Sequence, residues 1–143
     1  MTDILARDRN GLVVLDYETC LDRLRSRNVG RVALVEAGAP TILPVVYAMA
    51  GNAVVFRSTV GSKLEAAESS RPIAFEIDEH DTENRQGWSV LVTGVADVVD
   101  DPEIVDGLDA LGLDSWALAE AGDTAWIRIR AEAVTGRAAP PRD

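Results

Sequence analysis

The alternation of apolar and polar residues predicts a mainly β chain with few helices. Six segments are rich in apolar and β-branched residues and are bounded by turn-forming residues. The predicted strands are residues 31–36, 41–50, 53–58, 73–78, 87–99 and 124–137. The last contains the cleanest period of two, in Trp126-Ile127-Arg128-Ile129-Arg130. Because no regular crossover helices separate these segments, we expect a six-stranded antiparallel barrel rather than a parallel α/β sheet.

Helices are predicted where apolar residues recur at helical spacing. Asp16 is a candidate N-cap for a helix that runs to about Arg27. Its apolar stripe is formed by Tyr17, Cys20, Leu21 and Leu24. A second helix is predicted near 102–110, and a short helical turn at 114–120.

Two residues interrupt the strand pattern. Pro44 lacks a backbone donor and indicates a sheet edge or a bulge, and Gly94 indicates a bulge where a closing sheet bends. The chain of 143 residues fits one domain with an ordered core of about 12–137. We expect residues 1–10 to form a loose arm and the proline-rich tail, 138–143, to be disordered.

Charge and composition exclude several classes of partner. A net charge of −10 and a pI near 4.5 argue against nucleic acid and anionic membranes, which favour clustered Lys and Arg. No apolar run approaches the roughly 20 residues of a membrane span. The N-terminus shows no signal-peptide pattern, and the single Cys20 fits a reducing compartment. We therefore expect a soluble, cytoplasmic protein.

One segment differs from the acidic remainder. Residues 37–64 contain no Asp or Glu, although about five would be expected from the 24 acidic residues of the chain. Within it a strand runs through a hydroxyl-rich turn into a helix over 63–68, with Ser62 as candidate N-cap and Glu65 completing a capping box. Candidate phosphate ligands there are Arg57, Ser58, Thr59, Ser62 and Lys63. The alternative is an ordinary strand–turn–helix corner with solvated basic residues, and the spacing does not match a P-loop.

Other candidate residues have simpler explanations. His80, the only histidine, lies among acidic neighbours and could be a base or a metal ligand, but one imidazole without nearby cysteine is poor zinc chemistry, so no metal site is predicted. Cys20 fits a small core residue better than a nucleophile. Trp88 could either pack internally or cover a planar ligand.

The chain resembles the pyridoxamine 5′-phosphate oxidase-like family of FMN-binding split barrels, in particular the small flavin-nucleotide-binding and nitroimidazole-resistance-like members. The resemblance covers about residues 12–137 and rests on the order and spacing of five segments. These are Leu43-Pro44-Val45-Val46-Tyr47, residues 55–64, Phe75-Glu76-Ile77-Asp78, residues 87–94 and residues 126–130. It implies a mainly β, six-stranded antiparallel split barrel.

The resemblance also implies a cofactor and a site. Members are homodimers with FMN at the subunit interface and a small-molecule substrate. The phosphate would be held at the candidate segment around Arg57, Ser58, Thr59, Ser62 and Lys63. Pro44, Val45, Val46 and Tyr47 would lie along the isoalloxazine ring, with Trp88 and Ser89 as further flavin contacts.

The implied activity is an FMN-dependent transfer of hydride to an unidentified small organic acceptor. Vitamin B6 oxidation is not expected, because the C-terminal Arg-x-His of the true oxidases is absent. The alternatives are a non-enzymatic carrier or sensor of FMN, heme or a deazaflavin, and a scaffold without cofactor. Heme would require His80 as axial ligand.

Overall fold

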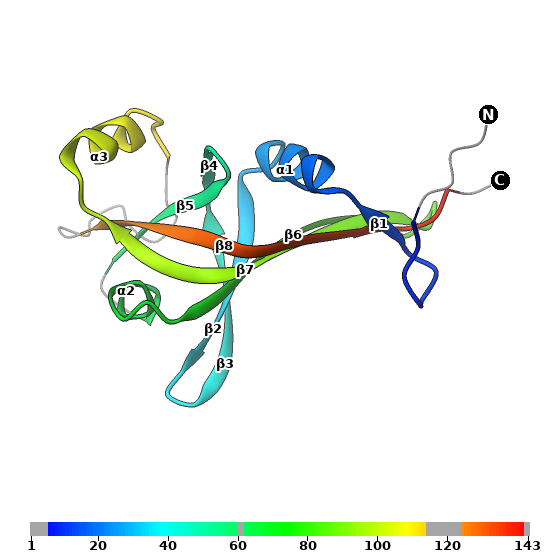
Figure 1. Cartoon of the computed structure of the whole chain (residues 1–143), viewed down its shortest axis with the longest axis horizontal. Helices are drawn as coiled ribbons and strands as arrows, with labels where there is room; N and C mark the ends of the chain where they lie inside the picture. Colours follow the sequence, from blue (N-terminus) through cyan, green and yellow to red (C-terminus); the bar gives the residue numbers. More distant parts are fainter. Residues whose placement is uncertain (1–5, 60–61, 114–123, 142–143) are drawn as a thin grey trace.

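The computed structural model describes residues 6–59, 62–113 and 124–141 as eight strands and three helices (Figure 1). The strands are β1 (Val13–Leu15), β2 (Val29–Glu36), β3 (Ala39–Val46), β4 (Ala48–Ala50), β5 (Ala53–Ser58), β6 (Pro72–Asp81), β7 (Gln86–Val99) and β8 (Ala125–Ala138). The helices are α1 (Tyr17–Arg25), α2 (Ser62–Glu68) and α3 (Pro102–Asp109). The helical turn predicted at 114–120 lies outside the described residues. The mainly β fold class is confirmed.

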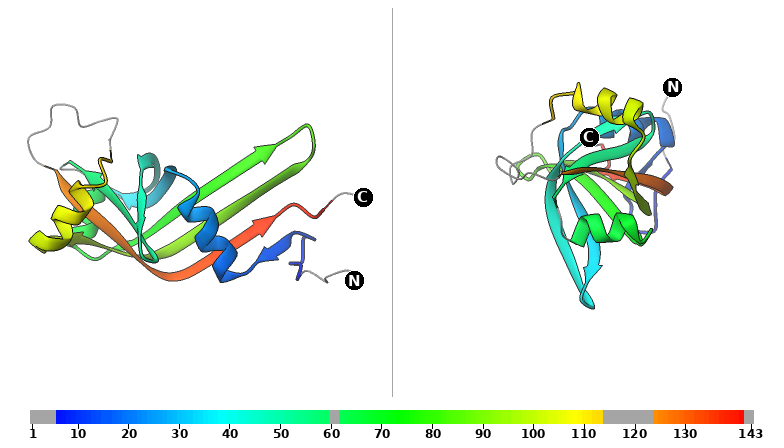
Figure 2. Two further views of the ribbon diagram at one scale, coloured as in Figure 1. Left: turned by 90° about the horizontal axis from the view of Figure 1, so that it is seen from above. Right: turned by 90° about the vertical axis from the view of Figure 1, so that its left-hand side faces the viewer.

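All strands belong to one antiparallel sheet in the order β3-β2-β6-β7-β8-β5-β4, with β1 added on β8. The two end strands of this order, β3 and β4, are consecutive in the chain and are separated only by Tyr47. The sheet therefore has to curl until its ends meet, which gives the half-closed barrel in Figures 1 and 2. Pro44 lies on the end strand β3, as its missing donor predicted.

The inner face of the curled sheet holds the main core. Phe56, Phe75 and Tyr47 are its largest fully buried side chains, and the rings of Tyr47 and Phe75 meet edge to face at 4.7 Å. Gly30 leaves the room that the Phe75 ring occupies, since a Cβ there would overlap the ring. Gly30 thus lies inside β2, where it allows the strand to pack against Phe75.

The helix α1 closes one side of this core. Asp16 caps it by accepting a 2.8 Å hydrogen bond from the backbone N–H of Thr19, as predicted. Cys20, Leu21 and Leu24 are buried, also as predicted, but Tyr17 is 47% exposed. Tyr17 lies on the same helical face as these residues but is the first residue of the helix, at its end.

The outer face of the sheet, opposite this core, carries the helix α3 over a second apolar cluster. Val55, Val99, Leu108 and Trp126 are buried there. The Trp126 indole N–H donates to Asp109 at 2.8 Å, which ties the end of α3 to β8. Asp101 caps α3 through a 3.0 Å hydrogen bond from the Glu103 N–H. The helix predicted near 102–110 is confirmed.

A β-bulge bends the long strands at the position predicted from Gly94. The β7–β8 register shifts between Thr93 and Gly94, and Glu132 is left without a partner in the ladder. A Cβ on Gly94 would overlap the carbonyl oxygen of Arg130. Only glycine allows the two backbones to approach this closely.

Beyond the barrel, the β6–β7 hairpin and the end of β8 project as an extension, called the arm here (residues 78–89 and 135–138; Figure 2). The two strands extend beyond their predicted bounds of 73–78 and 87–99, since β6 continues to Asp81 and β7 begins at Gln86. Ala138 pairs with both Trp88 and Val13, and the Ala139 N–H donates to Gly87 at 2.8 Å. The start of the predicted disordered tail is therefore part of the sheet.

The count of eight strands rather than six has two causes. The predicted strand 41–50 is divided at Tyr47 into β3 and β4, and the three-residue β1 has too little sequence to show a period. No helix in the described ranges is long and apolar enough to cross a membrane.

Candidate functional site

Arg57 lies at the end of β5, on the outer face, immediately before the turn that leads into α2. Its Nη2 donates to the Thr124 hydroxyl at 3.0 Å, and its guanidinium carbon lies 5.8 Å from the centre of the Trp126 ring. Its Nε is buried and has no hydrogen-bond partner among the described residues. One donor of a fixed guanidinium is thus left unsatisfied at the place where the sequence predicted an anion ligand.

The other predicted phosphate ligands are arranged unevenly. Ser58 follows Arg57 in the strand and therefore points to the opposite, inner face, where it is 4% exposed and donates to the Thr59 carbonyl at 3.0 Å. Its hydroxyl is not brought together with the Arg57 side chain. Thr59 is half-buried in the turn, and Ser62 begins α2, followed by Lys63. The predicted strand–turn–helix connection is present.

The segment predicted to lie along the flavin ring forms an exposed edge. The strand β3 pairs with β2 alone, so one row of its backbone N–H and C=O groups faces away from the sheet. Pro44 is exposed, Val46 half-buried and Val45 5% exposed. Such an edge can donate and accept hydrogen bonds along a planar polar ligand.

Tyr47, the last residue of that segment, has its side chain in the core. Its hydroxyl donates to the Leu24 carbonyl at 2.6 Å, and burial raises the pKa of the phenol. Only the backbone of Tyr47 is left to contact a ligand, and its N–H already donates to the Asn28 carbonyl at 2.9 Å.

Trp88 and Ser89 lie side by side on the arm but face opposite sides of the sheet. The Trp88 ring packs on the inner side, with the guanidinium carbons of Arg23 and Arg27 at 4.9 and 5.4 Å from its centre. Ser89 is half-buried, and both residues line a hollow of about 260 Å³ together with His80 and Arg137. Trp88 is half-buried, so it packs within the chain and also presents part of its surface to this hollow.

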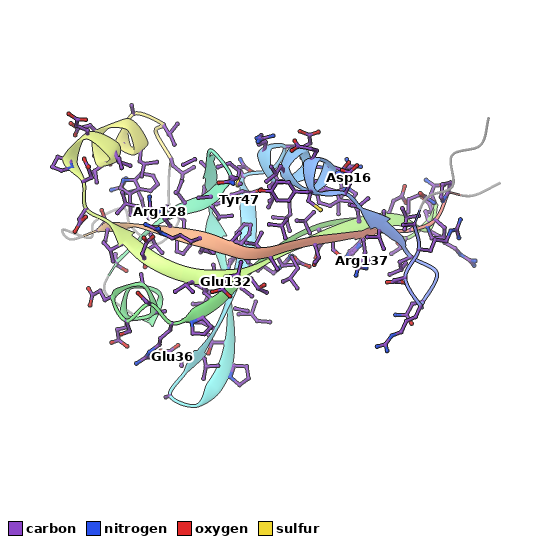
Figure 3. The ribbon with its side chains drawn as sticks, in the orientation of Figure 1. Asp16, Glu36, Tyr47, Arg128, Glu132 and Arg137 are labelled. Carbon is purple, nitrogen blue, oxygen red and sulfur yellow. The ribbon has the colours of Figure 1, made fainter. Side chains whose placement is uncertain are left out.

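Two groups of predicted site residues are far apart in one chain. Arg57 of β5 pairs with Trp126 of β8, and Trp126 pairs in turn with Val99 of β7. Ser89, on the same strand β7, pairs with Arg137 of β8. Ten residues of β7 separate Ser89 from Val99, which is about 33 Å at ~3.3 Å per residue. In Figure 3, Arg128, near the Arg57 end, and Arg137, near the Ser89 end, lie on opposite sides of the molecule.

His80 has a solvated side chain, 65% exposed, with Nε2 3.9 Å from an Asp78 carboxylate oxygen. Within the described residues, no group of three His, Cys, Asp or Glu side chains could hold a metal ion. Cys20 is fully buried, and burial raises the pKa of its thiol.

Sequence reasoning missed a charged cluster in the middle of the outer face. Arg31 Nη1 donates to Glu76 at 3.2 Å and to Asp78 at 3.4 Å. Burial, reinforced by the hydrogen bond and the charge of Asp78, raises the pKa of Glu76 to about 7. The period of two in Phe75-Glu76-Ile77-Asp78 places both carboxyls on one face and is the signal that could have revealed the pair.

Known proteins resemble this chain over most of its length. A family model described as pyridoxamine 5′-phosphate oxidase matches residues 16–138. The uncharacterized protein Rv0080 of Mycobacterium tuberculosis is 36% identical over 130 residues, 87% of this chain and 84% of that protein. The FAD binding protein from Mycobacterium smegmatis superposes with a TM-score of 0.73 at 32% identity, covering 90% of this chain and 100% of the other. A FAD-binding protein from Mesorhizobium loti gives 0.71 at 26% identity, covering 90% and 99%.

The fold is therefore that of the flavin-binding split barrels. The chain belongs to the pyridoxamine 5′-phosphate oxidase family, which confirms the resemblance drawn from its sequence.

Proposed function

We propose that this protein binds a flavin, FMN in the first place and FAD as the second candidate, with the phosphate end held where β5 meets α2. The observation that carries the proposal is Arg57. Its guanidinium is fixed by Thr124 and Trp126, and its buried Nε has no partner within the described ranges. An anion at the guanidinium would satisfy remaining donors in a chain of net charge −10.

The residues around Arg57 suit the same group. Thr59, Ser62 and Lys63 follow it within the acid-free segment and add two hydroxyls and an ammonium. Ser58 acts in this proposal through its backbone and by holding the turn, because its hydroxyl donates to Thr59. FAD is the second candidate because two relatives of similar length are named as FAD-binding proteins.

The ring of the flavin would lie along the edge strand β3. Along Pro44, Val45 and Val46 the backbone groups alternate between β2 and the open edge, and those at the open edge would meet the polar edge of the ring, while apolar side chains exclude water from it. Tyr47 contributes by holding the end of the strand, since its hydroxyl is bound to Leu24.

The site is proposed to be complete only in a homodimer. Ser89 and Arg57 lie at the two ends of a stretch of sheet about 33 Å long at ~3.3 Å per residue. The proposal therefore assigns them to different flavins, with Trp88 and Ser89 serving the flavin of a second copy. The part of the outer face formed by β2, β3 and β7 supports this arrangement, with Val35, Ile42 and Leu91 exposed by 60, 67 and 42%.

The proposed activity is that of an oxidoreductase. A bound flavin supplies the ability to accept a hydride from a donor and pass it to an acceptor. The protein binds and orients the flavin through the residues above and excludes water. A small organic acceptor other than a B6 vitamer is proposed, because the C-terminal Arg-x-His is absent. The cytoplasm is the proposed location.

The test is a flavin titration followed by fluorescence quenching. We expect Arg57→Gln and Lys63→Ala each to weaken FMN binding by roughly 1–3 kcal/mol, the loss of one charged hydrogen-bond partner. Arg71→Gln is the matched control, an exposed arginine for which we expect unchanged affinity. Wild-type protein that neither carries nor binds FMN or FAD would refute the proposal.

Two further measurements test the remaining parts. Anaerobic addition of NADH or NADPH to the loaded protein should bleach the flavin absorbance if it is an oxidoreductase, and a persistent oxidised spectrum favours a carrier. Sedimentation should show a dimer, and mixing Arg57→Gln with Ser89→Trp subunits should restore about one intact site per heterodimer. A monomer that binds flavin at full affinity would contradict the shared site.

A further inference from the structure

A second hollow, called the β8 groove here, lies on the outer side of β8 and is separate from the proposed flavin phosphate site. It measures about 610 Å³, within the roughly 300–1,000 Å³ of small-molecule sites. Its polar and larger lining residues are Tyr17, Asn52, Ile104, Leu108, Arg128, Arg130 and Glu132, with smaller apolar residues between them. In Figure 1 the helices α1 and α3 stand on the same side of β8, with β4 between them.

The bend of β8 forms the floor of the groove. The close approach of Gly94 to the Arg130 carbonyl and the extra residue Glu132 bend the strand at this point. Figure 3 shows Arg128 on the side of β8 that carries α3. Arg130 and the bulge residue Glu132 follow it along the strand, and all three residues line the groove.

Two arginines lie at one end of the groove. Asp97 accepts from Arg128 Nε at 3.1 Å, from Arg128 Nη2 at 2.9 Å and from Arg130 Nε at 2.8 Å. The hydrogen bond from Arg128 is the main cause that lowers the pKa of Asp97, so this carboxylate stays ionised. Glu132 adds a second carboxylate to the lining, so the donors that remain for a ligand are those of Arg130 rather than an excess of positive charge. The terminal nitrogens of Arg130 make no hydrogen bond within the described residues, and its side chain is 66% exposed.

The opposite rim carries an aromatic ring beside an amide. Tyr17 is 47% exposed although it begins a helix whose stripe is otherwise buried, and Asn52 Nδ2 lies 3.4 Å from its hydroxyl oxygen. A purine stacks on such a ring, and an asparagine amide matches the N6/N7 edge of adenine. Ile104, 45% exposed, and Leu108 supply an apolar wall.

We propose that the β8 groove binds an adenosine phosphate, with the base at Tyr17 and Asn52 and the phosphate at Arg128 and Arg130. The ligand could be a free mononucleotide or the adenylate part of a dinucleotide, either FAD or a nicotinamide donor. The inference does not require the proposed flavin site, because Arg57 does not line the groove.

The experiment is a titration of isotope-labelled protein with AMP, followed by amide chemical shifts. Saturable shifts should centre on residues 50–53 and 128–134. Arg130→Gln should weaken AMP binding on the order of tenfold, as expected for the loss of one charged hydrogen-bond partner. Arg25→Gln is the control, since this arginine also pairs with an aspartate but lies outside the groove, and it should leave AMP binding unchanged.

Competition identifies the source of the nucleotide. If AMP displaces FAD but not FMN, the groove holds the adenylate half of the flavin. If AMP displaces NADPH, the groove holds the nicotinamide donor. If AMP displaces neither FAD nor NADPH, the groove binds a free nucleotide. Each of these outcomes supports the groove. Absence of saturable shifts, or equal loss in Arg130→Gln and Arg25→Gln, would overturn it, whereas failure of flavin binding alone would leave it standing.

Discussion

The hydroxyl of Tyr47 donates to the carbonyl of Leu24 at 2.6 Å, and this hydrogen bond joins the last turn of α1 to the only residue between β3 and β4. The same ring meets Phe75 edge to face in the core. One side chain thus fixes a helix, the junction of the two end strands of the sheet, and the ring that packs on Gly30.

Replacing Tyr47 by phenylalanine should keep the packing and remove the hydrogen bond. We expect a loss of about 1–3 kcal/mol in the free energy of unfolding, because a buried polar group loses its partner. Urea unfolding measures this, with the half-exposed Tyr17→Phe as control. FMN affinity should change little, since the phenol is in the core. A strong loss of FMN affinity with unchanged stability would show that Tyr47 acts on the ligand directly.

Gly94→Ala should be strongly destabilising. The added Cβ would overlap the Arg130 carbonyl, and overpacking of this kind costs about 1–3 kcal/mol or more. Gly107→Ala is a matched control in α3, where a Cβ meets nothing within 4 Å and alanine favours the helix by roughly 0.5–1 kcal/mol. Thermal unfolding should therefore shift in opposite directions for the two variants. Equal shifts would contradict the close approach at the bulge.

Glu76 should make stability depend on pH. Its folded-state pKa of about 7 lies above the ordinary value of 4.5, so the folded chain retains a proton that the unfolded chain has lost between these values. This group therefore stabilises the fold below about pH 4.5, and the contribution is lost as the pH rises through about 7. The neighbouring charges are Asp78, which raises the pKa, and Arg31, which lowers it.

Glu76→Gln should remove the pH-dependent contribution of Glu76 to stability. The difference in unfolding free energy between wild type and variant should therefore change between about pH 4.5 and 7. Urea unfolding at several pH values measures it. Glu36→Gln, which changes an exposed carboxylate at the end of β2, is the control. A difference for Glu76→Gln that stays constant with pH would contradict a raised pKa of Glu76.

Cys20 should be inert in the folded protein. Its side chain is 0% exposed, and burial is the main cause that raises the pKa of the thiol. We expect a disulfide reagent to label it only as fast as the chain opens locally, and far faster in urea. Rapid labelling of the folded protein would indicate that α1 detaches readily from the sheet.

The elements with strong local causes could be predicted from the sequence. Asp16 accepts from the Thr19 N–H, and Gly94 lies at the bulge, because capping and close backbone approach depend on single residue types. Pro44 lies on an end strand for the same reason. The connection from β5 to α2 around Arg57 was also predicted, because acid-free composition and turn residues coincide there.

Features that depend on long-range packing could not be predicted. The strand β1 is three residues long and is defined only by its pairing with β8, more than 120 positions away. Ser58 was expected beside Arg57, but strand alternation turns it inward. The β8 groove assembles Tyr17, Asn52 and Arg130 from distant segments, so no local pattern reveals it.

The junction between β3 and β4 is the single residue Tyr47, so the number of residues in this junction must stay odd if both strands are to keep their faces. Side chains alternate between faces, and after the junction Met49 packs against the inner core while Ala48 packs on the outer cluster. Inserting or deleting one residue here would exchange the two faces of β4, whereas two residues would preserve them. Length changes among related chains should therefore accumulate in the turn at 82–85 and be restricted to even numbers, if any, between β3 and β4.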